Sequence, residues 1–421
     1  MILVGALLLV LAILGAPLFT VIAASAMMGY QQEGIELMAI AIEILGLAEM
    51  PFLSAIPLFT FAGYLLSESA APRRLVRLTN AVLGWMPGGL ALVALSACAF
   101  FTAFTGASGV TIIALGAILY PALQHDGYPD DFNLGLVTSA GSLGLLFAPS
   151  LPLILYGVIA EVPIDGLFRA GVLPGLLMLV MLSGWSFWVN RHNRKPAGSF
   201  SWREVRSALR ESMWELPLPV VVLGGIYSGF FAVSEAAAVT ALYVLIVEVL
   251  ILREVPLPDL PRIMRESMLL VGGILIILGV SLASTNYMID AGVPQKLLAV
   301  VAEMVTSPGS FLFLLLIFLL ILGAILDIFS AIVLVVPLIL PIASQYGIDQ
   351  YHLGIVFLAA MQLGYLTPPV GLNLFIASYR FDQPIMKVYS ATFPFLIILL
   401  LSVIVIAYWP QLSLWPVPAA G

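Results

Sequence analysis

Charge is scarce in this sequence. Lys, Arg, Asp and Glu together make up 9% of the 421 residues, whereas 62% of the residues are hydrophobic. Water-soluble domains carry about 25% charged residues, so the many apolar runs must face lipid rather than one water-soluble core. The composition predicts an all-α integral membrane protein that crosses the bilayer several times, and we expect no nucleic-acid partner.

Reactive and metal-binding side chains are also few. Cys98 is the only cysteine, which excludes an internal disulfide. His125, His192 and His352 are scattered without the spacing of metal ligands, so we expect no transition metal and no organic cofactor. An intramembrane enzyme would need a catalytic cluster at membrane depth, such as paired acids, and none is visible. The chain is therefore predicted not to be an enzyme.

The N-terminal region lacks the charged start of a signal peptide, and its apolar run continues far beyond a signal-peptide core. We expect a first membrane helix instead, bent near Gly15-Ala16-Pro17. Residues 31–50 carry four glutamates around an apolar face and are predicted as an amphipathic segment on the outer side, or as a partner surface. Together these parts form a predicted scaffold region over residues 1–50.

Two parts of the chain repeat the same pattern of helix breakers. Matched helix breakers are costly to keep for packing alone, so the duplication favours a functional role. We predict two related halves, over residues 51–175 and 268–395. The matching breakers stand 220 residues apart and are Pro121 with Pro341, Gly127 with Gly347, Gly144 with Gly364, Pro149 with Pro369, and Pro174 with Pro394.

Basic residues predict how the halves enter the membrane. They cluster at 73–77, in the loop 191–214 and at 253–265, and the positive-inside rule assigns all three clusters to the cytoplasm. Counting apolar spans between the clusters puts residues 71–80 inside and 289–307 outside. The two halves then enter from opposite faces, as in an inverted repeat.

Each half contains apolar arms that are too short to cross a bilayer, which takes about 20 helical residues. Such arms fit re-entrant helical hairpins, and in each half the hairpin is followed by a transmembrane helix broken by glycine and proline. Irregular backbone at membrane depth must be buried in protein or line a watery cavity, so tips and broken helices should meet near the bilayer centre. The hairpins are predicted over 88–124 and 308–346, with tips at 105–111 and about 327–330, and the broken helices over 132–160 and 352–380.

Broken helices offer groups for ions of both signs. Unwinding at Gly141, Ser142 and Gly144 frees carbonyls for a cation, and Pro149 removes a competing donor. The N-termini of half-helices attract an anion. The second half offers Gly364, Thr367, Pro368 and Pro369 for the same purpose. The alternative interpretation is a hinge or a tight helix crossing.

No fixed cation is expected near these segments. The sequence has no Lys or Arg between Arg77 and Arg169, or between Lys296 and Arg380. A bound anion would then be neutralised by helix N-termini, hydroxyls and co-bound cations. Asp327 is the only acid within a hairpin tip, and it either contacts a cation or caps the half-helix that follows.

Other segments complete a predicted scaffold. Residues 176–267 are expected to form scaffold helices around the cytoplasmic basic loop, and 396–421 the end of the last helix and a tail. Short segments that mix charge with Leu, Val and Trp should lie along the interface as arms or braces. They span residues 71–80, 200–213, 255–267 and 291–304.

Several stretches together resemble a known family. They are IPLFTFAGYLL, the first tip TGASGVT, GSLGLLFAPSLPLILYG leading to LFRAGVLPG, and LDIFSAIVLVVPLILPI followed by GYLTPPVGLNLF. Over nearly its whole length the chain resembles the large membrane subunit of tripartite ATP-independent periplasmic (TRAP) transporters, called DctM or SiaM.

The resemblance implies a sodium-driven importer of a small organic anion, a carboxylate or a sulfonate, in the bacterial inner membrane. It also implies an elevator-type transport domain, like that of the wider ion-transporter superfamily, held by a scaffold. Two partners are implied as well, a periplasmic substrate-binding protein and a small four-helix membrane subunit.

Sodium sites are implied where each hairpin tip faces its broken helix. Many relatives have a serine-rich first tip, whereas here Ala107 offers only its backbone. By motif, the sodium-binding residues are Thr105, Gly106 and Ser108 with Gly141 and Ser142, and Asp327 and Ser330 with Gly364 and Thr367. For the anion we expect contacts from Ala107, Pro149, Ser150, Pro369 and Asn373.

Two other transport functions remain open at this point. A stand-alone sodium-coupled anion transporter would share the hairpins and broken helices but would need no binding protein. A channel would need a continuous pore and would show a much faster flux.

Overall fold

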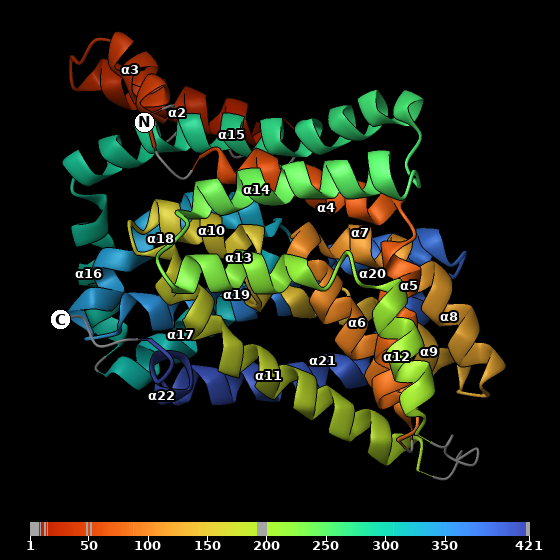
Figure 1. Ribbon diagram of the computed structural model, residues 1–421. Coiled ribbons are helices and arrows are strands. Elements are labelled where there is room, and N and C mark those ends of the chain that lie inside the picture. The colour runs from red at the N-terminus through yellow and green to blue at the C-terminus, as the bar shows by residue number, and fades with distance from the viewer. Residues whose placement is uncertain are drawn as a thin grey trace.

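The computed structural model describes residues 8–417 except 9, 12, 13, 15, 48, 51, 52, 87, 192–199 and 306. Every regular element among these residues is helical, and they contain no β-strand (Figure 1). The prediction of an all-α protein is confirmed. A helix pairs its backbone N–H and C=O groups within one segment, which allows it to enter lipid.

Five helical segments of the described chain are long and apolar enough to cross a membrane, each with at least 18 residues. The chain is therefore a multi-pass membrane protein. Two further pairs are bent at short breaks. The bend is 49° between α7 (Ser108–Ala114) and α8 (Gly116–His125), and 42° between α9 (Asp130–Ala140) with the 3-10 turn η1 (Leu143–Leu146) and α10 (Leu151–Ile159). The five segments are α11 (Ile164–Val189), α14 (Val233–Leu245) with the π-helix η2 (Ile246–Ile251), η3 (Leu257–Asp259) with α15 (Leu260–Asp290), α18 (Ile328–Gln345) and α21 (Ile385–Tyr408).

The helices lie side by side in layers (Figure 1). One side is formed by α15, with α2 (Leu18–Gln32) and α3 (Met38–Leu47) packed against it, and α4 (Ala55–Glu68) packs between α15 and α14. α11 and α21 form the opposite side. Between them lie α10 (Leu151–Ile159) and α19 (Gln350–Gly364), which are buried over almost their whole length.

Shorter helices occupy the ends of the molecule. The predicted interfacial segments contain α5 (Ala71–Leu83), α12 (Trp202–Glu211) and α16 (Val293–Met304). The separate segment predicted over 255–267 is wrong, because residues 260–267 are the first turns of the 31-residue α15. Pro261 stands in the first turn of α15, where no backbone N–H is needed, so the helix continues into the apolar run.

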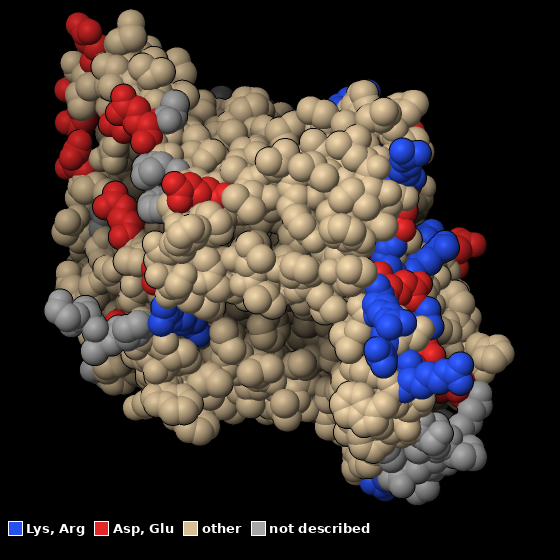
Figure 2. Space-filling view, viewed as in Figure 1, with Lys and Arg blue, Asp and Glu red and all other residues tan. Residues whose placement is uncertain are grey.

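Acidic and basic side chains gather at opposite ends of the helices (Figure 2). Asp and Glu gather at the end that holds α3, which we call the acidic end. Lys and Arg gather at the opposite, basic end, where α5 and α12 lie. Residues 192–199 of the predicted basic loop 191–214 lie outside the described residues, as do residue 15 and most of the segment before α2, and the later part of the loop forms α12. Pro17 directly precedes α2.

The chain folds back between α6 (Gly89–Thr105) and α7 (Ser108–Ala114), which continues as α8 (Gly116–His125). Tyr128, just after α8, lies against the backbone of Ala91 at the start of α6, so both arms return to one end. Only Gly106 and Ala107 are irregular, and the predicted irregular tip over 105–111 is therefore too long. Gly106 has a φ of 63°, a left-handed conformation that glycine adopts readily at a helix end.

A second folded-back pair is formed by α17 (Pro308–Gly323) and α18. The Tyr346 hydroxyl donates to the Val305 carbonyl at 3.1 Å, and its ring stacks on Phe311 near the start of α17. The irregular residues are 324–327, so the tip predicted at 327–330 is shifted toward the N-terminus and Ser330 lies inside α18. The shift arises because Asp327 caps α18 and starts the helix early.

Both predicted broken helices are interrupted. α9 (Asp130–Ala140) ends before the 3-10 turn η1 (Leu143–Leu146), and α10 begins only at Leu151. α19 ends at Gly364, and α20 (Leu372–Arg380) follows after seven irregular residues. Each interruption contains one cis peptide bond, Ala148–Pro149 or Pro368–Pro369. The remaining helices are α13 (Pro217–Tyr227), which packs on α14, and α22 (Gln411–Leu414).

Candidate functional site

The first tip, residues 105–108, packs against the first break, residues 141–150. The Thr102 hydroxyl of α6 donates to the Gly141 carbonyl at 2.8 Å and lies 2.6 Å from the Thr111 hydroxyl. Because a hydroxyl has one hydrogen, Thr111 must donate to Thr102. Both threonines are fully buried. This chain of hydrogen bonds joins both arms of the first folded-back pair to the end of α9.

Gly141 is required by this close approach. A Cβ at position 141 would lie 2.5 Å from Cγ1 of Ile112 and 3.2 Å from the Ser108 carbonyl oxygen. A larger residue would therefore push α7 away from the first break. The structure thus brings Ser108 and Gly141 together, two residues that the family resemblance implies for one sodium site.

Several buried hydroxyls in and beside the first break have little or no pairing. Ser139 and Ser150 are fully buried, and neither Oγ has a hydrogen-bond partner. Ser142 is also fully buried, and its Oγ makes one long contact, 3.4 Å from the Ser139 carbonyl. Leaving a buried hydroxyl unpaired costs about 1–3 kcal/mol. These groups are therefore suited to a ligand that offers a charge or a hydrogen-bonding atom.

Asn373 links the first tip to the second half of the chain. The Ser108 hydroxyl donates to Oδ1 of Asn373 at 2.7 Å, and Nδ2 of Asn373 donates to the Thr138 carbonyl at 3.5 Å. Asn373 is fully buried. Ser108 begins α7 and Asn373 is the second residue of α20, so two helix N-termini, which attract anions, meet at this contact.

The second tip, residues 324–327, and the first turn of α18 pack against the second break, residues 365–371. A Cβ on Gly364 would lie 2.5 Å from the Cα of Gly323, so α17 and α19 touch through backbone at this point. The Ile328 N–H donates to the Tyr365 hydroxyl at 2.8 Å, and the Gly371 N–H donates to the Ala324 carbonyl at 3.3 Å. These bonds satisfy backbone groups that would otherwise be exposed to lipid.

Asp327 acts as the cap of α18. Its Oδ1 accepts the N–H groups of Phe329 and Ser330, both at 3.0 Å, and its Oδ2 accepts the Ser330 hydroxyl at 2.5 Å. Of the two roles considered for Asp327, the helix cap is present in the structure. The Ser330 hydroxyl takes part in the same cap, because it donates to Asp327. Thr367 is half-buried, and its hydroxyl donates to the Leu363 carbonyl at 3.1 Å.

The first tip and break are less exposed than the second tip and break. Thr105, Gly106, Gly141 and Ser142 are all buried, as are Pro149 and Ser150, and Ala107 is half-buried. In the second region Asp327 and Pro369 are exposed. The Tyr389 hydroxyl of α21 donates to the Pro369 carbonyl at 2.7 Å. The first region is thus closed, and the second opens to the surface of the chain.

The polar groups at both tips are carbonyl, hydroxyl, carboxylate and amide oxygens. Oxygen ligands of this type suit hard cations such as Na⁺, whereas soft transition metals prefer sulfur and imidazole nitrogen. The described residues contain no cluster of His, Cys, Asp and Glu that would hold a metal ion.

Arg380, at the end of α20, donates its Nε to the Ile113 carbonyl of α7 at 3.1 Å.

Sequence reasoning missed three contributors. Thr102 could have been found, because it is a hydroxyl in an apolar run one turn before the tip. Thr138 contributes its main-chain carbonyl, which has no sequence signal. Tyr365 was missed because its contact with Ile328 joins residues 37 positions apart and depends on how the helices pack.

Comparisons with known proteins show which family the sequence resembles. The family model for the DctM component of the tripartite ATP-independent periplasmic transporter matches residues 5–412. The C4-dicarboxylate TRAP transporter large permease protein DctM of Pseudomonas aeruginosa is 37% identical over 377 residues, which cover 89% of this chain and 88% of that protein.

Two further similarities extend the comparison. The isethionate TRAP transporter permease protein DctMQ of Oleidesulfovibrio alaskensis is 32% identical over 364 residues, covering 86% of this chain and 57% of that protein. The crystal structure of the Alcanivorax borkumensis YdaH transporter has a similar fold, with a TM-score of 0.64 at 13% identity, over 90% of this chain and 89% of that chain.

Proposed function

This chain belongs to the family of DctM components of tripartite ATP-independent periplasmic transporters, and on that premise we propose that it carries a small organic anion across the bacterial inner membrane together with Na⁺. The proposed solutes are carboxylates or sulfonates. Relatives named for C4-dicarboxylate and for isethionate support a class of this breadth.

The contact of Ser108 with Asn373 and Gly141 carries this proposal. It brings one hairpin tip, one broken helix and the N-termini of two half-helices to a single buried place. Oxygen atoms there suit Na⁺, and the helix N-termini suit the negative charge of the solute. A co-bound Na⁺ would offset the charge of the anion where Lys and Arg are lacking.

Each proposed sodium site pairs a tip with a break. The first consists of Thr105, Gly106, Ser108, Gly141 and Ser142, and the second of Asp327, Ser330, Gly364 and Thr367. In the second site Asp327 already caps α18, so we propose that backbone carbonyls dominate there. The anion would lie between the sites, near Ala107, Pro149, Ser150, Pro369 and Asn373.

The proposed movement is of the elevator type, in which the two folded-back pairs and broken helices shift together against a scaffold. The layered arrangement supports it, because α15, α4 and α14 form a continuous outer layer on one side. The charge separation supports an orientation with the basic end in the cytoplasm. As partners we propose a periplasmic substrate-binding protein and a small four-helix membrane subunit.

Uptake into proteoliposomes tests the proposal. The chain would be reconstituted with the small subunit, and the binding protein would be added outside with a labelled C4-dicarboxylate or isethionate. We expect uptake only with an inward Na⁺ gradient and the binding protein. Uptake by the chain alone would instead indicate a stand-alone anion transporter, and flux far above transporter rates would indicate a channel. Uptake that is indifferent to Na⁺ would refute the coupling.

A further inference from the structure

Arg74 of α5 lies in a cluster of three glutamates at the basic end. Its Nε donates to Oε1 of Glu215 at 2.6 Å, and its two terminal nitrogens donate to Glu254, one of them at 3.0 Å. The third carboxylate, that of Glu248, lies 3.6 Å away, beyond hydrogen-bonding distance. Arg74 is 7% exposed and Glu248 is buried, whereas Glu215 and Glu254 are half-buried.

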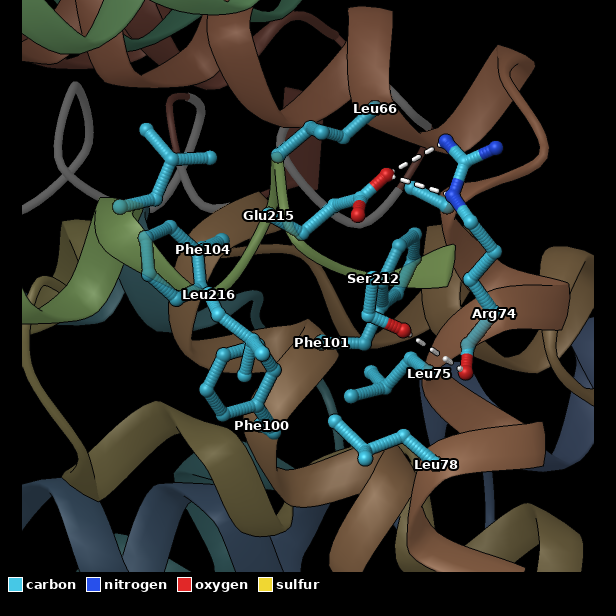
Figure 3. A pocket seen from close by; sticks show the side chains of 12 residues that line it. Leu66, Arg74, Leu75, Leu78, Phe100, Phe101, Phe104, Ser212, Glu215 and Leu216 are labelled. Carbon is cyan, nitrogen blue, oxygen red and sulfur yellow. Dashed lines mark hydrogen bonds and ion pairs between the residues drawn. The ribbon is translucent and has the colours of Figure 1, made fainter. Parts of the chain in front are cut away.

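The cluster joins separate parts of the fold. Glu215 lies in the turn between α12 and α13, Glu248 in the π-helix η2, and Glu254 in the loop that follows. Figure 3 shows Arg74 and Glu215 at the edge of an apolar pocket lined by Phe100, Phe101 and Phe104 of α6. α5 packs on α6, so the cluster connects the first folded-back pair to the helices of the outer layer.

Glu254 is held in its ionised form. Besides Arg74, the Ala70 N–H donates to it at 2.8 Å. Burial acts to raise the pKa of Glu254, but the hydrogen bonds from Arg74 and the Ala70 backbone outweigh burial and hold the pKa below its usual range. Glu254 is therefore a good hydrogen-bond acceptor.

Glu248 has the opposite environment. It is 1% exposed and is the one buried acid among the described residues, and its Oε2 has no hydrogen-bond partner. The same terminal nitrogen of Arg74 lies 3.0 Å from Glu254 and 3.6 Å from Glu248, so the two carboxyl groups face each other across it and are close enough to share a hydrogen bond. Two carboxylates cannot bond to each other without a proton between them.

No neighbouring group supplies that hydrogen. The charged and titratable groups that face Glu248 are Arg74, Glu215, Glu254 and Tyr243. The Tyr243 hydroxyl donates to the Trp214 carbonyl at 2.7 Å. The Ser69 hydroxyl also lies within hydrogen-bonding reach of Glu248, but a hydroxyl has one hydrogen, and the geometry directs it to the Leu66 carbonyl at 3.0 Å.

The net charge of the cluster indicates which ligand it needs. With every group ionised, one guanidinium would face three carboxylates and the cluster would carry two excess negative charges, one of them on the fully buried Glu248, which is strongly unfavourable. The described acids form no group with the arrangement of a metal site. A proton is the ligand that fits, because it needs no coordination shell and supplies the hydrogen that the Glu248–Glu254 contact requires.

We propose that Glu248 binds a proton at neutral pH and donates it in a hydrogen bond to Glu254, and that this protonated pair, with Arg74, holds α5 against the outer layer. Loss of the proton leaves two carboxylates facing each other and loosens this joint. The inference concerns Arg74, Glu248 and Glu254 and does not depend on the transported solute.

Infrared spectroscopy of the full chain in detergent tests the proposal directly. Exposed acids are ionised at neutral pH, so the wild-type spectrum should contain the C=O band of one buried carboxylic acid that shifts in heavy water. Glu248→Gln should lose this band, and the matched control Glu36→Gln, which changes an exposed acid at the other end, should keep it. Absence of the band in the wild type, or its persistence in E248Q, would overturn the proposal.

Two further measurements keep the proposal falsifiable. The melting temperature of the wild type should rise as the pH falls from about 8 to about 6, because only the folded chain holds this proton, and E248Q should lose that slope. If E248Q does not fold, Glu254→Gln must shift the wild-type band, since it removes the acceptor and leaves the acid. A band that appears only when Na⁺ is withdrawn would show a cation site instead and would refute a bound proton.

Discussion

Replacing Gly364 with alanine perturbs the second tip by a known amount. The new Cβ would lie 2.5 Å from the Cα of Gly323, and this backbone atom cannot rotate away. Carbon atoms pack at about 3.5–4.0 Å, so α17 and α19 would have to separate by about 1 Å at this point. The separation would move Tyr365 away from the N–H of Ile328.

The expected loss follows from this displacement. Overpacking costs about 1–3 kcal/mol, and alanine recovers up to about 1 kcal/mol of helix propensity, so the fold should survive with a modest loss of stability. A shift of about 1 Å at a binding site can lower the rate about 100-fold. We expect Na⁺-dependent uptake by Gly364→Ala proteoliposomes to fall on that order, while membrane insertion and most of the melting temperature are retained.

Gly184→Ala is the matched control. Position 184 also lies within a helix, α11, but a Cβ there meets no atom within 4 Å. Uptake should be unchanged in this variant, and its stability equal or higher by up to about 1 kcal/mol. If G364A transports as fast as G184A, the contact of the second tip with α19 does not control transport.

Three other substitutions give distinct outcomes. Asn373→Leu should lower the uptake rate at least about tenfold, because it leaves the buried Ser108 hydroxyl without its acceptor at a cost of about 1–3 kcal/mol. An uptake rate equal to that of the wild type would contradict this. Asp327→Asn should retain the helix cap and the uptake rate. Asp327→Ala should lower the free energy of unfolding by about 1 kcal/mol, measured by thermal unfolding. A markedly higher Na⁺ requirement in D327N would show that the charge of Asp327 binds the cation. Arg74→Gln should destabilise the chain by about 3–5 kcal/mol in denaturant unfolding, because it removes a buried guanidinium and leaves the half-buried carboxylates of Glu215 and Glu254 without their cation. Arg77→Gln, at exposed ion pairs, should change the unfolding free energy little, and equal losses would contradict the difference in burial.

The helix breaks were predictable from the sequence because their cause is local. Proline cannot donate to the preceding turn, and glycine lowers helix stability, wherever the chain folds. The breaks before Leu151 and Leu372 therefore lie where the sequence placed them. The extent of each tip was less predictable, because it depends on caps such as Asp327, and a cap can start a helix several residues earlier than composition suggests.

Contacts between distant residues could not be predicted in the same way. Ser108 and Asn373 are separated by 265 residues, and Ile328 and Tyr365 by 37. Nothing in the local sequence of Asn373 points to Ser108, because hydrogen bonds of this kind depend on which helix faces which. The difference in exposure between Pro149 and Pro369 has the same origin, since both lie in similar sequence surroundings.

The sequence alone determined three properties: the chain is a membrane protein, its helices end at predictable glycines and prolines, and its charges gather in a few segments. Those properties follow from composition, backbone chemistry and the cost of charge in lipid. The tertiary structure decided which tip meets which break, that Asp327 caps a helix, and that Arg74, Glu248 and Glu254 share one buried place. Packing brings these groups together from separate helices, and only their separation determines whether they form hydrogen bonds or repel each other.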